Sequence, residues 1–149
     1  MVAVDHSETA KLAFQEGLRL AKENHAQLHI VHVVDEFMLI SGEILIDYPR
    51  YERAIRDYGQ MLLSQLESQA NKENINIKTY LLEITEYSAR IPEQIINAAA
   101  NVHADLIIVG THGRRGFSRI LLGSVAEGII RIAESPVLLI RGNHEQKSR

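Results

Sequence analysis

Short apolar runs typical of β-strands alternate along this chain with helical repeats of apolar residues. The apolar runs predict strands at residues 2–4, 28–34, 75–84, 105–109 and 136–140. Apolar residues recur at the i, i+3, i+4 spacing of amphipathic helices over residues 10–21, 54–70, 91–102 and 122–133. This order predicts an α/β fold, built as an open, doubly wound parallel five-stranded sheet with helices on both faces.

Composition favours one globular domain over residues 1–149, with 46% hydrophobic and 23% charged residues. The net charge of −3 argues against a dedicated nucleic-acid-binding protein. The absence of cysteine excludes disulfides, thiolate zinc sites and cysteine nucleophiles. No apolar run approaches the ~20 residues of a membrane span, and the start lacks a signal-peptide pattern. We therefore expect a cytoplasmic protein with no membrane contact. The first strand is unusually short, which is consistent with the loss of residues before Met1.

Ligands of such sheets bind beyond the carboxyl ends of the strands, where the strand order reverses. This rule predicts a site whose rim includes Asp5, residues 33–35 and the loop after Val109. The Asp5 carboxylate could accept hydrogen bonds from a ribose hydroxyl or an adenine amine. A cap for the following helix is the alternative, and both roles can hold through different atoms. Ser7 is the residue that we expect to cap this helix.

The loop that begins at Gly110 carries the strongest chemical signal, because it follows a strand, precedes a helix and is rich in glycine and arginine. Its spacing is G-x2-G-x9-G-S, from Gly110 through Gly113 to Gly123 and Ser124. Glycine permits positive φ and close approach of a phosphate, and a helix N-terminus supplies free N–H groups. The loop also contains positive charge at Arg114, Arg115 and Arg119. The alternative is a turn that only needs glycine. There is neither a P-loop nor a G-x-G-x-x-G motif.

Three motifs make the chain similar to the universal stress protein family: V-A-V-D-H-S at residues 2–7, H-V-V-D at residues 32–35, and G-x2-G-x9-G-S. Members of this family that bind ATP carry the glycine pattern. The resemblance implies a Rossmann-like fold of the adenine nucleotide alpha hydrolase type, cytoplasmic location, dimers, and a role in stress survival and signalling. It also implies ATP as the ligand, with Mg²⁺ carried in by the phosphates.

The resemblance implies that Asp5 contacts the ribose or adenine side of the nucleotide and that Val33 contacts the adenine. It places one further group around the ribose and phosphates: Gly110, Gly113, Gly123, Ser124 and Val125. The predicted nucleotide site is completed by Ala3, Val4, Val109, Arg114 and Gly116.

Two other features of the sequence are candidate sites. His6, His32 and His112 could meet at the crevice, but the spacing favours no metal site, since His29 and His32 face opposite sides of a strand. The connection from Asp35 to Pro49 is too apolar for an ordinary loop. It is interpreted as a short helix packed on the core, or as a lid or partner surface beside the nucleotide.

These observations predict an ATP-binding universal stress protein that acts as a nucleotide-dependent regulatory module with a further signalling partner. No catalytic residue is predicted, because the glycine motif contains no evident general base. The alternatives are a slow ATPase or phosphotransferase, and a nucleotide-free dimeric scaffold. The last strand, from Pro136 to Arg141, should lie at a sheet edge and pair antiparallel with its own copy in a homodimer.

Overall fold

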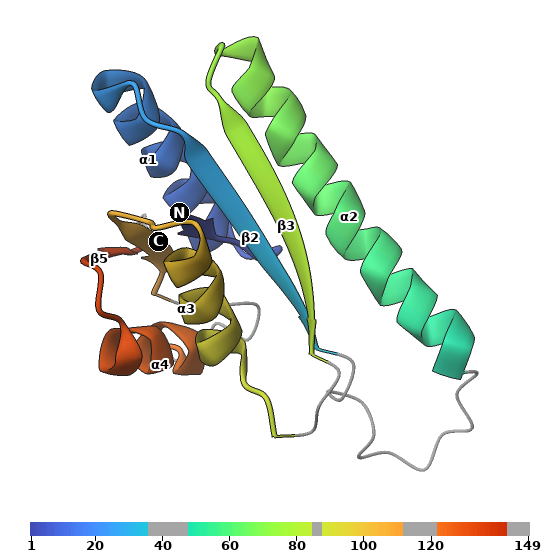
Figure 1. Ribbon diagram of the computed structural model, residues 1–149. Coiled ribbons are helices and arrows are strands. Elements are labelled where there is room, and N and C mark those ends of the chain that lie inside the picture. Colours follow the sequence, from blue (N-terminus) through green and yellow to red (C-terminus); the bar gives the residue numbers. More distant parts are fainter. Residues whose placement is uncertain (36–47, 85–87, 112–121, 143–149) are drawn as a thin grey trace, which may run out of the picture.

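The computed structural model describes residues 1–35, 48–84, 88–111 and 122–142, which form one parallel sheet flanked by helices (Figure 1). The strands are β1 (Val2–Ala3), β2 (Leu28–Asp35), β3 (Ile77–Ile84), β4 (Ile107–Gly110) and β5 (Val137–Ile140). The helices are α1 (Glu8–Asn24), α2 (Tyr48–Lys72), α3 (Ile91–Asn101) and α4 (Ser124–Ile132). All neighbouring strands are parallel, in the order β3-β2-β1-β4-β5, which confirms the predicted fold class.

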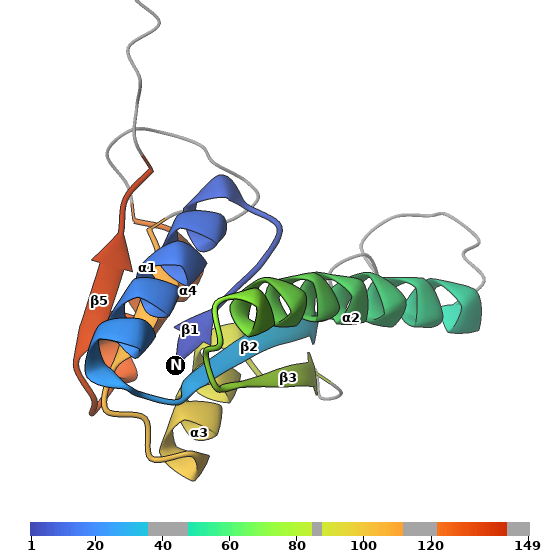
Figure 2. The ribbon, with the colours of Figure 1, turned by 90° about the horizontal axis from the view of Figure 1, so that it is seen from above.

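The helices cover the two faces of the sheet in pairs, α1 with α2 on one face and α3 with α4 on the other (Figure 2). Side chains of β1 alternate between two apolar cores, with Val2 packed toward α1 and Ala3 toward α3 and α4. Phe14 is the largest fully buried side chain of α1, and Ile129 is the largest fully buried side chain of α4. The central strand β1 is therefore buried on both faces, as parallel sheets require.

Within the described residues, no helix is long and apolar enough to cross a membrane.

Several predicted boundaries are wrong by a few residues. Residues 75–76 precede β3, and Ile75 instead donates its backbone N–H to the carbonyl of Ala70 at the end of α2. The predicted connection from Asp35 to Pro49 is also shorter, because Asp35 pairs with Ile84 inside the sheet and Pro49 belongs to the first turn of α2. Proline fits there because the first N–H groups of a helix have no intrahelical acceptor. Residues 36–47, with the predicted helix or lid, lie outside the described residues.

The apolar repeat that predicts α2 includes two large side chains that the structure exposes. Tyr58 and Met61 are 50% and 57% exposed, whereas Leu62, Leu63 and Leu66 are buried. The reason is geometric, since α2 packs mainly on β2 and β3 and buries only one stripe.

The start of the sheet extends to the first residue of the chain. The Met1 ammonium group donates to the carbonyl of Leu106 at 2.7 Å, and the Met1 carbonyl accepts from the N–H of Ile108 at 2.8 Å. Burial lowers the pKa of this ammonium group, and the nearby Asp105 carboxylate partly offsets the effect.

Candidate functional site

The carboxyl ends of β1 and β4 lie side by side where the strand order reverses. The chain moves outward from β1 through β2 to β3 and then returns across the sheet to β4. Continuing the observed registers by two residues brings Asp5 level with Val33 of β2 and with Thr111 after β4. Ligands of open α/β sheets bind at such a point. Three neighbouring strands therefore form the predicted rim.

Asp5 forms an Asx turn at the start of α1. Its Oδ1 atom accepts a hydrogen bond from the backbone N–H of Ser7 at 2.9 Å. The hydroxyl oxygen of Ser7 accepts from the N–H of Ala10 at 3.2 Å, which confirms Ser7 as the N-cap. Within the described part of the chain, nothing donates a hydrogen bond to the Asp5 Oδ2 atom, and the side chain is partly exposed. The Asx turn therefore uses one carboxylate oxygen of Asp5 and leaves the other available for a ligand.

The amino end of α4 is held against the end of β4. The backbone N–H of Gly123, the N-cap residue of α4, donates to the carbonyl of Thr111 at 2.8 Å. The next N–H groups, those of Ser124 and Val125, belong to the first helical turn and have no intrahelical acceptor. Ser124 is exposed. Together with the helix dipole, these N–H groups favour an anion at this end of α4.

Gly110 and Gly123, the two glycines of this motif that the structure describes, do not use the positive φ that the sequence suggests. Gly123 has φ −65° and ψ 149°, an extended conformation open to any residue. No glycine in the described ranges has positive φ. Gly110 is instead required by close packing, because a Cβ atom there would collide with Thr9 of α1. The prediction of positive φ is therefore wrong at Gly110 and Gly123, and the absence of a side chain is what matters.

The structure gathers most of the predicted site residues at the ends of β1, β2 and β4 and at the start of α4. These are Ala3, Val4, Asp5, Val33, Val109, Gly110, Gly123, Ser124 and Val125. The side chains of Ala3, Val4 and Val109 are buried in the core, so these residues could reach a ligand only through main-chain atoms. Gly113, Arg114 and Gly116 lie outside the described residues, as do His112, Arg115 and Arg119.

Sequence reasoning expected His6 and His32 near Asp5 but missed that Tyr58 of α2 joins them in a group of rings. The Nδ1 atom of His32 lies 2.8 Å from the carbonyl oxygen of Val4, and His32 is buried. His6 stacks on Tyr58 of α2, with ring centroids 3.7 Å apart and an interplanar angle of 16°. Only the alternation along β2 hinted that His32 points to this face. Nothing in the local sequence indicates that Tyr58 reaches the loop after β1.

Of the three histidines considered as metal ligands, the structure describes His6 and His32. His6 and His32 lie close, with ring centroids 5.9 Å apart, as the sequence suggested. No group of three or more His, Asp or Glu side chains over residues 1–35, 48–84, 88–111 and 122–142 could hold a metal ion. His29 contacts Tyr80 on the opposite face of β2, which confirms that His29 and His32 diverge.

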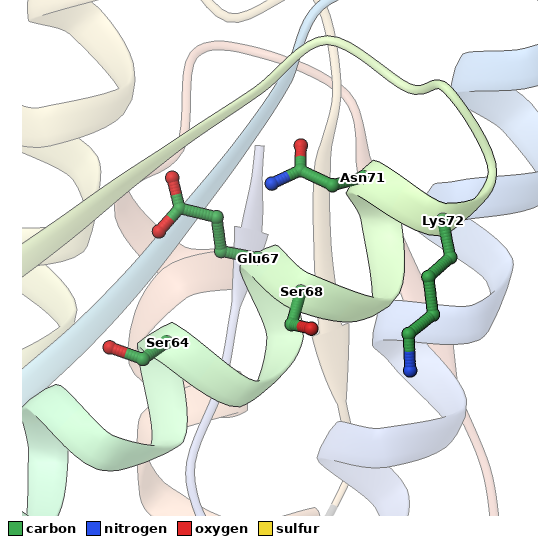
Figure 3. Close-up of a pocket in the computed structure, with 5 residues that line it drawn as sticks. All are labelled: Ser64, Glu67, Ser68, Asn71 and Lys72. Carbon is green, nitrogen blue, oxygen red and sulfur yellow. The ribbon is translucent and has the colours of Figure 1, made fainter.

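An open groove of about 490 Å³ lies elsewhere, along the carboxyl-terminal half of α2 (Figure 3). All of its lining residues come from this one helix: Ser64, Glu67, Ser68, Asn71 and Lys72. Because α2 runs opposite to the strands, the groove lies near their amino ends and away from Asp5 (Figure 1). It is therefore not part of the candidate site.

A parallel sheet of order β3-β2-β1-β4-β5, with Asp5 and the start of α4 at the reversal of strand order, places the chain among the doubly wound α/β proteins. Residues 1–141 match the model of the universal stress protein family. The chain belongs to this family. Universal stress protein MJ0531 of Methanocaldococcus jannaschii is 30% identical over 142 residues, which cover 95% of this chain and 80% of that protein.

Solved structures of the family are similar to this chain in fold. The crystal structure of a universal stress family protein from Burkholderia pseudomallei is 31% identical, with 93% of each chain covered and a TM-score of 0.73. The universal stress protein of Archaeoglobus fulgidus in complex with dAMP is 26% identical, with 93% of this chain and 94% of that chain covered and a TM-score of 0.63.

Proposed function

We propose that this chain binds ATP at the crevice beside Asp5 and acts as a nucleotide-dependent regulatory module of the stress response. One observation carries the proposal: an available carboxylate oxygen of Asp5 and the open first turn of α4 lie at the same switch point of the sheet. The carboxylate suits a ribose hydroxyl or adenine amine, and the helix end suits phosphate. The dAMP complex of the Archaeoglobus fulgidus relative supports an adenine nucleotide.

The proposed ligand fits the chemistry of these residues. The end of α4 offers N–H donors without a bulky side chain at its N-cap, Gly123. Arg114, Arg115 and Arg119 of the intervening loop would add positive charge to the phosphate side. Mg²⁺ would enter with the nucleotide, because it binds phosphates and water with few protein ligands. The cytoplasm is the compartment that we propose, since it supplies free ATP.

The test is direct identification of the ligand. Small molecules extracted from the purified protein and analysed by mass spectrometry should include an adenine nucleotide. Titration of ATP into nucleotide-free protein should give saturable binding, and GTP should bind more weakly because the base differs. Protein that carries no nucleotide and binds none on titration would favour the scaffold alternative.

Asp5→Asn is the sharpest variant for this site. The amide keeps an oxygen that can accept from the N–H of Ser7, so the Asx turn before α1 survives. It replaces the second acceptor by a donor, so we expect ATP affinity to fall at least about tenfold, or 1.4 kcal/mol. Asp105→Asn is the matched control, because Asp105 is exposed and precedes β4 at the other end of the sheet. Equal ATP affinity in folded Asp5→Asn would contradict the assignment of Asp5.

A further inference from the structure

His32 contacts the backbone between β1 and Asp5. Its Nδ1 atom lies 2.8 Å from the carbonyl oxygen of Val4, the residue before Asp5. A carbonyl oxygen only accepts, so Nδ1 carries the proton and donates. The Val4 N–H donates to the carbonyl of Val31 at 2.9 Å. Both polar backbone groups of Val4 are thus bound to β2, one of them through a side chain.

The imidazole of His32 is itself fixed between the sheet and α2. A Cβ atom on Gly59 would lie 2.8 Å from Cδ2 and 3.2 Å from Nε2 of His32, so α2 passes directly over the ring. The ring is only 7% exposed. Because a packed ring cannot rotate freely, its Nδ1–H keeps one direction, toward Val4.

The residue that follows Asp5 is tied to the same helix. His6 stacks on Tyr58, which precedes Gly59 in α2, and its ring also meets the edge of His32. Both chain neighbours of Asp5 are therefore held by contacts that involve α2. Asp5 lies between these two contacts, although, among the residues that the structure describes, its own side chain bonds only to the start of α1.

We propose that His32 is a positioning residue of the nucleotide site: by holding the Val4 carbonyl, it fixes the direction of the Asp5 carboxylate. This inference rests on the proposed function. It adds to the nucleotide site a residue that acts through the backbone of Val4 and does not itself contact the nucleotide. It also couples α2 to the site, since a shift of α2 at Gly59 moves the ring and with it the end of β1. A site loses much of its affinity for the ligand when a binding group is misplaced, even though the group itself is intact.

The test compares two amides at position 32 with the wild-type chain. In His32→Asn, the amide N–H can take the place of Nδ1–H, so ATP affinity should stay within about threefold of wild type. In His32→Gln, the amide reaches the place of Nε2 instead, and affinity should fall about tenfold, or 1.4 kcal/mol. His32→Leu removes the donor entirely and should bind as weakly as the glutamine variant. His29→Leu, on the opposite face of β2, is the matched control and should bind ATP as wild type does.

Effects on stability are distinguished from effects on ATP binding by measuring both in each variant. Urea unfolding without nucleotide gives the free energy of unfolding. Calorimetric titration with ATP is then performed under conditions in which that variant is folded. The amide NMR signals of Asp5 and Ser7 should move in His32→Gln and stay in place in His32→Asn. The wild-type imidazole should show the ¹⁵N pattern of a ring protonated at Nδ1.

The outcomes distinguish this inference from the proposed function. Folded His32→Gln and His32→Leu proteins that bind ATP like wild type would overturn the positioning role while the nucleotide site stands. A wild-type chain that binds no ATP would instead overturn the proposed function. The positioning of Asp5 would then be judged by the NMR signals alone, and unchanged Asp5 and Ser7 signals in His32→Gln would reject it.

Discussion

A Cβ atom on Gly110 would lie 2.6 Å from the hydroxyl oxygen of Thr9 and 2.9 Å from its backbone carbonyl carbon. Real Cβ atoms do not approach other atoms this closely. Gly110 begins the glycine motif, yet its nearest constraint is the first turn of α1. The motif therefore contains at least one glycine that serves the fold, and a loss of ATP binding after its replacement would not by itself identify a phosphate contact.

Gly110→Ala should destabilise the protein by about 1–3 kcal/mol, the usual cost of overpacking a close contact. Thr9→Ala in the same chain should recover only part of the loss, because the backbone of Thr9 also lies within the clash. Gly142→Ala is the control, since its nearest contact is the methyl group of Thr9 at 3.3 Å. Urea unfolding measures all three. Equal stabilities of Gly110→Ala and wild type would contradict the packing role.

Gly123→Val should weaken ATP binding with little cost to folding. Gly123 has φ −65° and ψ 149°, which valine adopts readily. The new side chain would stand at the N-cap of α4, where phosphate is proposed to approach. We expect ATP affinity to fall tenfold or more, about 1.4 kcal/mol, in titration calorimetry. Unfolding experiments on the same variant supply the control. Unchanged ATP affinity in the folded variant would reject the phosphate assignment.

The predicted fold followed from patterns that are local in the sequence. Strand-type runs alternate with helical spacing, and a right-handed crossover rule then leaves few topologies. The cap at Ser7 was also predictable, because capping depends on residues within one turn. The start of α2 was not, since the apolar repeat of this helix begins only after residue 53 while its first turn contains Pro49.

Only the residues of the candidate site that belong to short sequence motifs could be predicted. Asp5 and Gly123 are identified by position along the chain, and the sheet brings them to one edge. The contact of His32 with Val4 joins residues 28 positions apart, and no short motif encodes it. Likewise, the sequence alone does not show whether glycine is needed at position 110 for a phosphate or for packing against Thr9.

ATP turnover should be far below the ~10 s⁻¹ median of enzymes. No residue of the glycine motif is an evident general base that could activate water. The expectation is checked by steady-state phosphate release from protein purified free of contaminating ATPases. Turnover near the enzyme median that is lost in Ser124→Ala would favour the ATPase or phosphotransferase alternative.

Stability should fall on acidification in part because of His29. Burial lowers the pKa of His29 below its ordinary value of 6.5, and the positive charges of the N-terminal ammonium group and Lys78 lower it further. As the pH falls, His29 is therefore protonated in the unfolded chain before it is protonated in the folded chain. The contribution of neutral His29 to stability is present above pH 6.5 and is lost as the pH falls through the lowered pKa of the folded state.

His29→Asn tests this contribution, because asparagine does not titrate and its amide group can take the place of Nδ1 beside the hydroxyl of Tyr80. Urea unfolding of the wild-type and variant chains is compared at slightly alkaline pH and at about pH 5. The variant should lose less stability than wild type over this interval. An equal loss in both chains would show that His29 does not contribute.

Assembly through β5 is the remaining proposal. This strand lies at the edge of the sheet, as predicted. The carbonyls of Pro136 and Ile140 accept hydrogen bonds from Ile107 and Thr111 on the β4 side. Because successive backbone groups of a strand alternate in direction, the N–H and C=O of Leu139 point away from β4, toward the open edge. An open edge of this kind is a template for pairing, and a two-fold axis would pair it with its own copy.

Leu139→Pro should break this dimer while sparing the fold, because it removes a donor that points outward and leaves the bonds to β4 intact. Leu139→Ala is the matched control, since it shortens the same side chain but keeps the N–H. We expect light scattering or sedimentation at micromolar concentration to report dimers for wild type and Leu139→Ala, and monomers for Leu139→Pro. α4 exposes Ile130 and Ile132 on the segment that precedes β5, which adds apolar surface for such an association. A wild-type mass of one chain at that concentration would refute this assembly.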